Sequence, residues 1–211
     1  MQPISLSRIL SYWADDLGDQ VAIHHEGREI TWHELEARTN RLARAYASMG
    51  VDQDDFVTIA LPNGIEFFES CFATWKVGAT PQPVSAKLPK FERDQIIEIA
   101  KPKLVVGITE GDDPGVQTIP EGFVPDPTLS DTPLPERTAT SLKAMTSGGS
   151  TGRPKLIVSA DPASIDPDAP ALNFEMKGSV LIPGPLYHNG PFAWGMAAVF
   201  KGNQVTVTTR F

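Results

Sequence analysis

The sequence has 211 residues, of which 41% are hydrophobic and 21% are charged, a composition typical of a globular protein with one sizeable core or two small ones. Acidic residues outnumber basic residues by 26 to 18, and the net charge of -8 argues against a general affinity for nucleic acid or anionic lipid. Cys71 is the only cysteine, which excludes an internal disulfide and predicts a packing role in a reducing compartment. Since no segment has the pattern of a signal peptide or a transmembrane span, we expect a cytoplasmic protein.

The first part of the chain is expected to form two helices and a strand. Residues 4–17 place apolar side chains at helical spacing, and residues 21–25 have the pattern of a short strand. Thr31 and Glu34 form a capping-box pattern at the start of a second helix, which Gly50 is expected to end.

From Asp55 onward, strands alternate with helices, which favours a parallel sheet because parallel neighbours need a crossover connection. Strands are predicted over 56–61, near Pro83 and over 103–107. One helix is predicted to begin after Asn63, whose side chain would cap it. Another is predicted from Pro89 to about residue 100. The helix after Asn63 has apolar side chains over so much of its circumference that it must be buried on more than one side: Phe67, Phe68, Cys71, Phe72 and Trp75.

The segment between Glu110 and Glu136 contains six prolines and seven acidic residues but no Lys or Arg, which predicts a weakly ordered linker or an exposed loop. Strands are then predicted up to Thr146, over 155–158, over 179–183 and over 204–208. A loop is predicted over 160–170, and an amphipathic helix, with Phe192 and Val199 on one face, before the last strand.

The overall prediction is an α/β protein with a parallel-rich sheet and flanking helices. The subregions 1–108 and 140–211 are expected to be joined by the Pro/Asp-rich loop. The sequence stops at Phe211, directly after a predicted strand, so we expect it to be part of a longer, truncated protein. An unpaired last strand and exposed apolar surface would favour pairing with a second copy, so a homodimer is a further expectation.

A loop rich in Gly, Ser and Thr lies between the predicted strands that end at Thr146 and begin at Lys155. Its glycines would let backbone N–H groups converge on an anion, its hydroxyl groups would add donors, and Lys155 would add a positive charge. The predicted phosphate-binding residues are Thr146, Ser147, Gly148, Gly149, Ser150, Thr151, Gly152 and Lys155. A flexible turn is the alternative, but the stiff Pro154 exit and the flanking strands favour the phosphate site.

Two common phosphate-binding patterns do not fit this loop. The P-loop needs Gly-Lys-Ser/Thr at the start of a helix, whereas Gly152 is followed by Arg153 and Pro154. The dinucleotide pattern Gly-x-Gly-x-x-Gly is absent from the sequence.

The run Ser147-Gly-Gly-Ser-Thr-Gly-Arg-Pro-Lys155 resembles the phosphate loop of the adenylate-forming superfamily, which includes acyl-CoA synthetases, peptide-synthetase adenylation domains and luciferases. The usual form is Thr-Ser-Gly-Ser/Thr-Thr-Gly-x-Pro-Lys-Gly. Here Ser147 replaces the first Thr, Gly148 replaces the Ser, and Leu156 replaces the last Gly.

A second run, Pro185-Leu-Tyr-His-Asn-Gly190, resembles the Pro-Leu/Met-Phe/Tyr-His motif of the same superfamily, which lies between a strand and a helix. Taken alone, His188 would be a capping or packing histidine; together with the loop it becomes a site candidate. Residues 28–35 resemble the opening of the superfamily more weakly. The resemblance spans about the whole chain, and these two motifs are its specific part.

The resemblance implies a reaction in which ATP and a carboxylic acid give an acyl-adenylate and pyrophosphate, after which a thiol, usually that of coenzyme A, takes the acyl group. It implies catalytic roles for Lys155 and His188 and a role for Ser147 and Thr151 in orienting Mg²⁺. The implied residues of the acyl site are Tyr187, His188, Asn189 and Gly190.

The adenine-binding segment and the C-terminal domain of this superfamily have no counterpart within residues 1–211, so we expect the chain alone not to form an acyl-adenylate. The two motifs together resemble those of ligases for bulky sterol or bile-type acids and of some fatty-acyl-CoA ligases. Two alternatives are an adenylation domain that loads a carrier protein and a non-catalytic nucleotide-binding module.

Overall fold

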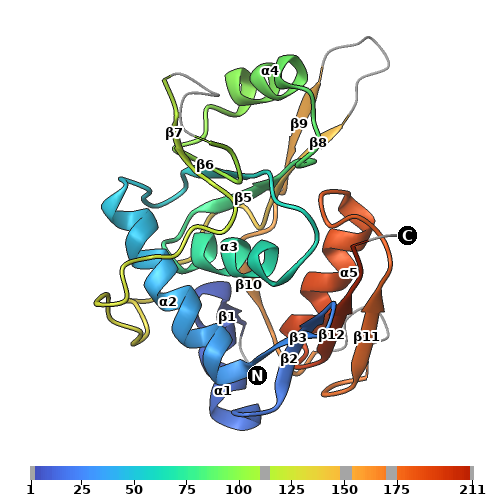
Figure 1. Cartoon of the computed structure of the whole chain (residues 1–211). Helices are drawn as coiled ribbons and strands as arrows, with labels where there is room; N and C mark the ends of the chain where they lie inside the picture. The colour runs from blue at the N-terminus through green and yellow to red at the C-terminus, as the bar shows by residue number, and fades with distance from the viewer. Residues whose placement is uncertain (1–2, 110–114, 148–153, 170–174, 210–211) are drawn as a thin grey trace.

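The computed structural model describes residues 3–109, 115–147, 154–169 and 175–209 (Figure 1). The helices in these ranges are α1 (Leu6–Leu17), α2 (Trp32–Ser48), α3 (Ile65–Lys76), α4 (Lys90–Ala100) and α5 (Asn189–Phe200). The strands are β1 (Ile4–Ser5), β2 (Val21–His25), β3 (Arg28–Thr31), β4 (Phe56–Ile59), β5 (Thr80–Pro83), β6 (Leu104–Val106), β7 (Gln117–Ile119), β8 (Ala144–Ser147), β9 (Lys155–Val158), β10 (Ser164–Ile165), β11 (Ser179–Ile182) and β12 (Gln204–Val207).

One four-stranded sheet is entirely parallel, with the strand order β5-β4-β6-β7. Its first three strands are the ones that the alternation of strands and helices predicts. The carboxyl ends of these strands lie at one edge of the sheet, which is where ligands bind in open α/β folds. The α/β class with a parallel sheet is therefore confirmed.

A second four-stranded sheet has the order β11-β12-β2-β3 and joins the two ends of the chain. The strands β11, β12 and β2 are parallel, whereas β2 and β3 form an antiparallel hairpin. Val205 of β12 pairs with Ile23 of β2, so this sheet needs residues from both ends of the sequence.

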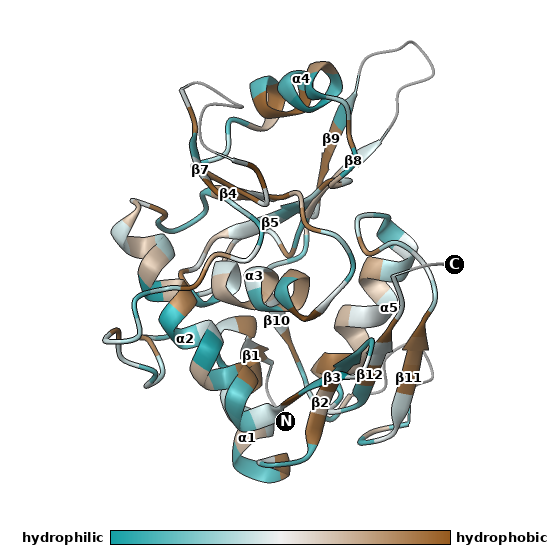
Figure 2. Cartoon of the chain, viewed as in Figure 1, coloured by the Kyte–Doolittle hydropathy of each residue, from teal (hydrophilic) through white to brown (hydrophobic). Residues whose placement is uncertain are grey.

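Helix α3 lies between the two four-stranded sheets, since it contacts β4 and β5 on one side and β2 on the other (Figure 1). Its aromatic side chains are buried, and Phe72 and Trp75 meet edge to face at 5.3 Å between ring centroids. Cys71 is also fully buried, which confirms its predicted packing role. The apolar side chains that surround α3 thus follow from its position between two layers. Figure 2 shows that β4 beside it is also largely apolar.

The predicted capping box is confirmed at the start of α2. The backbone N–H of Glu34 donates to Thr31 Oγ1 at 3.2 Å, and Glu34 Oε2 accepts from the backbone N–H of Thr31 at 2.9 Å. Gly50 follows the helix with a φ of 87°, the left-handed conformation that glycine adopts without strain.

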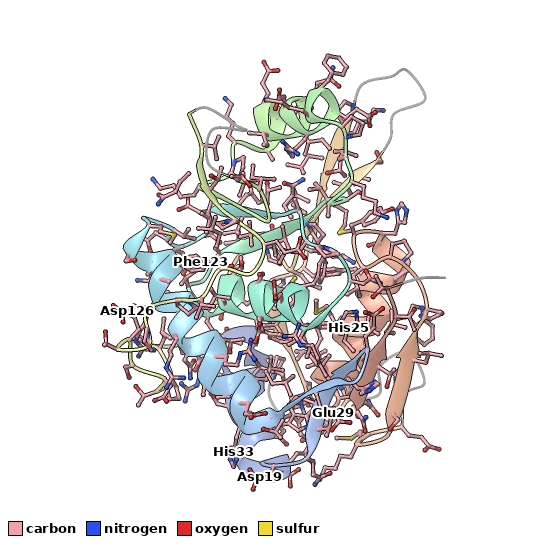
Figure 3. All side chains as sticks on the ribbon, in the orientation of Figure 1. Asp19, His25, Glu29, His33, Phe123 and Asp126 are labelled. Atoms are coloured by element: carbon pink, nitrogen blue, oxygen red, sulfur yellow. The ribbon has the colours of Figure 1, made fainter. Side chains whose placement is uncertain are left out.

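The acidic, proline-rich segment is more ordered than its composition predicts. Within it, β7 pairs in parallel with β6, and Arg41 of α2 donates to the backbone oxygen of Leu129. Arg41 also forms an ion pair with Asp131. Figure 3 labels Phe123 and Asp126, which lie beside α2. The segment therefore obtains its positive partners from a helix far away in the sequence.

The loop predicted over 160–170 also differs from the prediction. It contains β10, which pairs with β1, and the Lys201 ammonium group donates to the backbone oxygen of Asp166 at 2.7 Å and to that of Pro167 at 3.0 Å. The buried lysine thus holds the loop through backbone carbonyl groups, which any sequence supplies. No helix in the described ranges is long and apolar enough to cross a membrane.

Candidate functional site

A cavity of about 510 Å³ lies beside the end of β8, beyond the carboxyl end of β5. Thr146 and Ser147 contribute one wall, Tyr187 and His188 another, and Pro154 lies at the start of β9. The cavity therefore brings together the two motifs that the sequence singles out, although 40 residues separate Ser147 from Tyr187 along the chain. Its size is in the range of small-molecule and cofactor sites.

The two strands that flank the Gly/Ser/Thr loop form an antiparallel pair. Ser147, the last residue of β8, is directly opposite Lys155, the first residue of β9. Residues 148–153 lie outside the described part of the chain, so the predicted phosphate contacts of Gly148, Gly149, Ser150, Thr151 and Gly152 remain predictions.

Lys155 is exposed and does not line the 510 Å³ cavity. As the residue opposite Ser147, it shares one face of the β8–β9 pair with that hydroxyl group. Of the two predicted Mg²⁺ residues, Ser147 is in the cavity wall and Thr151 lies outside the described residues. Within the described ranges, no three His, Cys, Asp or Glu side chains come together as a metal site.

Tyr187 and His188 are held by the turn that leads from β11 into α5. The backbone N–H of His188 donates to the Pro185 oxygen at 3.0 Å, and the backbone oxygen of His188 accepts from the N–H of Phe192 at 3.0 Å. The two rings are adjacent, with 4.4 Å between their centroids. This turn presents both rings to the cavity.

Asn189 and Gly190 do not line the cavity. The side-chain oxygen of Asn189 instead accepts a hydrogen bond of 2.7 Å from the Lys143 ammonium group, while Gly190 is exposed. Lys143 also lies 5.5 Å from the ring centroid of Phe192, and burial lowers the pKa of this lysine. Lys143, which was not predicted as a site residue, links the segment before β8 to the start of α5.

Asn63 was predicted to cap α3, but the structure shows that it does not. The N-cap residue is Gly64, and it makes no side-chain capping bond. The side-chain nitrogen of Asn63 donates to the backbone oxygens of Gly184 and Thr208, both at 2.9 Å, and its oxygen accepts from the N–H of Leu186 at 2.8 Å. Asn63 therefore holds the turn that leads to His188, because partners far away in the sequence compete successfully with the local cap.

The third wall of the cavity is formed by α4 and the residues before it, which were not predicted to belong to the site. Leu88, Phe91 and Gln95 line the cavity from this side. Phe91 and Gln95 are four positions apart in α4 and therefore lie on one face of the helix, while Leu88 lies just before it. The sequence feature that could have indicated this wall is the position of the segment directly after the carboxyl end of a parallel strand.

The comparison with known proteins agrees with the two motifs. Residues 10–211 match the AMP-binding enzyme family. A dimodular nonribosomal peptide synthase of Bacillus subtilis is 31% identical over 115 residues, which are 54% of this chain and 5% of that protein.

Solved structures show the same fold. The o-succinylbenzoate CoA synthetase of B. subtilis aligns with all of this chain and 45% of its own, at a TM-score of 0.82 and 21% identity. The N-terminal domain of FACL13 from Mycobacterium tuberculosis aligns over 99% of this chain and 58% of its own, at a TM-score of 0.80 and 18% identity. The chain thus spans about half the length of these structures and a small part of the peptide synthase. The match over residues 10–211 confirms the superfamily resemblance, and the chain belongs to the AMP-binding enzyme family.

Proposed function

We propose that this chain forms part of the site at which an acid-thiol ligase uses ATP to activate a carboxylic acid. A carboxylate oxygen attacks the α-phosphorus of ATP, and pyrophosphate leaves. The thiol sulfur of coenzyme A then attacks the acyl carbon, AMP leaves with the acid's former oxygen, and the thiol proton passes to solvent. The observation that carries the proposal is the cavity shared by Thr146, Ser147, Tyr187 and His188.

The described residues fit this chemistry at both ends of the cavity. The Ser147 hydroxyl is a hard oxygen ligand of the kind that Mg²⁺ takes together with phosphate oxygens and water. On the same face of the β8–β9 pair, Lys155 would offset negative charge on the β- and γ-phosphates. Tyr187 and His188 would border the acid, beside the apolar side chains of α4.

A fatty acid or a bulky sterol- or bile-type acid is the proposed substrate class. The motif resemblance supports both, and the cavity has an apolar wall that includes Leu88 and Phe91. A carrier-protein thiol is the second candidate acceptor, because a nonribosomal peptide synthase is among the relatives. The proposed compartment is the cytoplasm, on the ground that the chain contains only one cysteine.

The test measures acid-dependent pyrophosphate release by the complete gene product with fatty, aryl and sterol acids, followed by thioester formation with coenzyme A or a phosphopantetheinyl carrier. Lys155→Ala should raise the KM for ATP about tenfold, and His188→Ala should mainly change the preference among acids. Lys103→Ala is the matched control, since Lys103 is exposed and precedes β6 at the opposite end of the sheet. Absence of pyrophosphate release with every acid would refute the proposal, and unchanged ATP kinetics in Lys155→Ala would refute the role of that lysine.

A further inference from the structure

We infer that Gln82 is a positioning residue for the proposed ATP site. It holds Thr146 in place and thereby positions the cavity wall that Thr146 and Ser147 form. The inference rests on the proposed function. Gln82 lies in β5 and is fully buried. Its side-chain nitrogen donates to Thr146 Oγ1 at 2.9 Å, and its side-chain oxygen accepts from the Thr58 hydroxyl group.

The backbone of β5 explains why a side chain has to make this connection. The N–H groups of Thr80 and Val84 donate toward the β4 side, to the oxygens of Asp55 at 2.8 Å and Ile59 at 3.0 Å. Because N–H groups alternate between the two edges of a strand, positions 81 and 83 face the opposite edge. Both positions are proline, which has no N–H to donate.

The free edge of β5 therefore lacks the donors for a backbone ladder, and among the described residues β8 pairs only with β9. Side chains make the connections instead. Thr80 Oγ1 donates to the Ser141 oxygen at 3.0 Å, just before β8, and Gln82 donates to Thr146 near the end of β8. The second connection is the one next to the cavity.

The orientation of the Gln82 amide group is set by its two partners. The Thr58 hydroxyl donates to the amide oxygen, so the amide NH₂ group faces Thr146. Because Thr58 and Gln82 are fully buried and Thr146 is half-buried, loss of the central amide leaves polar groups without partners and lets β8 shift relative to β5. A small shift of Thr146 and Ser147 changes the distances that an ATP site depends on.

The test compares Gln82→Met, Thr146→Val and the double variant in the complete gene product. Gln82→Met keeps the length of the side chain but loses both hydrogen bonds. We expect it to raise the KM for ATP about five- to tenfold, the size of one lost hydrogen bond, with less than a twofold change in the KM for the acid. In the Thr146→Val background it should add little, because its partner is already gone. Thr146→Ser, which keeps the hydroxyl group that accepts from Gln82, should recover most of the ATP affinity that Thr146→Val loses.

Thr74→Val is the matched control, because it also removes a buried hydroxyl group, one that donates to the Ser70 oxygen within α3. It should lower the melting temperature without changing the KM for ATP. If the wild-type protein is active but Gln82→Met behaves like this control, or if its effect adds fully to that of Thr146→Val, the inference is wrong while the proposed function stands. If the wild-type protein activates no acid, the proposed function itself fails.

Discussion

The ammonium nitrogen of Lys76 lies 2.6 Å from the Oε2 atom of Glu36, and the pair is buried between α3 and α2. The Oε1 atom of Glu36 also accepts hydrogen bonds from Ser11 at 2.7 Å and from Asn40 at 2.9 Å. Burial lowers the pKa of Lys76, and the negative charge of Glu36 opposes this effect. The pair therefore joins three helices around two charges that depend on each other.

Removing one partner of this ion pair should be far more harmful than removing both. Glu36→Leu leaves a buried ammonium group without a counter-charge, and we expect it to cost about 3–5 kcal/mol of unfolding free energy. The double variant with Lys76→Met should recover much of this loss. Urea unfolding of the wild type, the two single variants and the double variant measures the coupling between Glu36 and Lys76. Fully additive effects of the two substitutions would contradict the prediction. Asp94→Asn, which breaks the half-exposed Lys90–Asp94 pair, is the control and should cost less than about 0.5 kcal/mol.

The unfolding free energy should depend on pH through Glu69. Burial raises the pKa of this carboxyl group, and Arg38, 2.7 Å away, opposes the shift. The folded state thus holds the proton more tightly than the unfolded state. The stability from this group is fully present below the unfolded pKa, about 4.3, and is lost as the pH rises through the higher folded pKa.

Glu69→Gln removes this titration. Relative to wild type, the variant should therefore gain stability as the pH rises from about 4 to 7, measured by urea unfolding at a series of pH values. Glu98→Gln changes an exposed carboxyl group on α4 and should show no such trend. A constant difference between Glu69→Gln and wild type over this range would contradict the prediction.

Asn63→Ala should loosen the turn before His188. The substitution removes three hydrogen bonds to the backbone and leaves the buried Leu186 N–H without its acceptor. We expect a loss of about 2–3 kcal/mol and at least tenfold faster amide hydrogen exchange at Leu186. Gln53→Ala, which removes one exposed side-chain bond to the Thr138 oxygen, should leave that amide unchanged. Equal exchange rates at Leu186 in all three proteins would show that Asn63 does not hold the turn.

Cys71 should react with thiol reagents only when the protein opens. The side chain is fully buried in α3, and burial raises the pKa of its thiol well above the usual range. At pH 8 we expect labelling by a disulfide reagent to be at least a thousandfold slower in the folded chain than in urea. The Glu36→Leu variant should label faster, by the same factor as its open form becomes more populated through the lost stability. Rapid labelling of the folded wild-type chain would contradict the buried position of Cys71.

The elements that the sequence predicts well depend on interactions over a few residues. The capping box of Thr31 and Glu34 spans three positions, and the apolar circumference of α3 can be read from its own residues. Motif resemblance led us to expect Thr146, Tyr187 and His188 in one site, and all three line the 510 Å³ cavity.

The features that the sequence does not reveal depend on distant partners. Asn63 is a good helix cap by residue type, yet its side chain bonds with residues more than 120 positions away. Strand β7 lies in a segment with the composition of a linker and forms because β6 offers a free edge. Gln82 is an ordinary polar residue in the sequence, and only the position of β8 shows what it contacts.

The pairing of β12 with β2 has a consequence for how the protein is made. During synthesis, β2 leaves the ribosome early with β3 at one edge, while β12, which covers its other edge, is translated about 180 residues later. The N-terminal hairpin must therefore wait with an open edge, and contacts between such distant residues slow folding. Nascent chains that stall before β12 should be especially prone to aggregation and should depend on chaperones until β12 is in place.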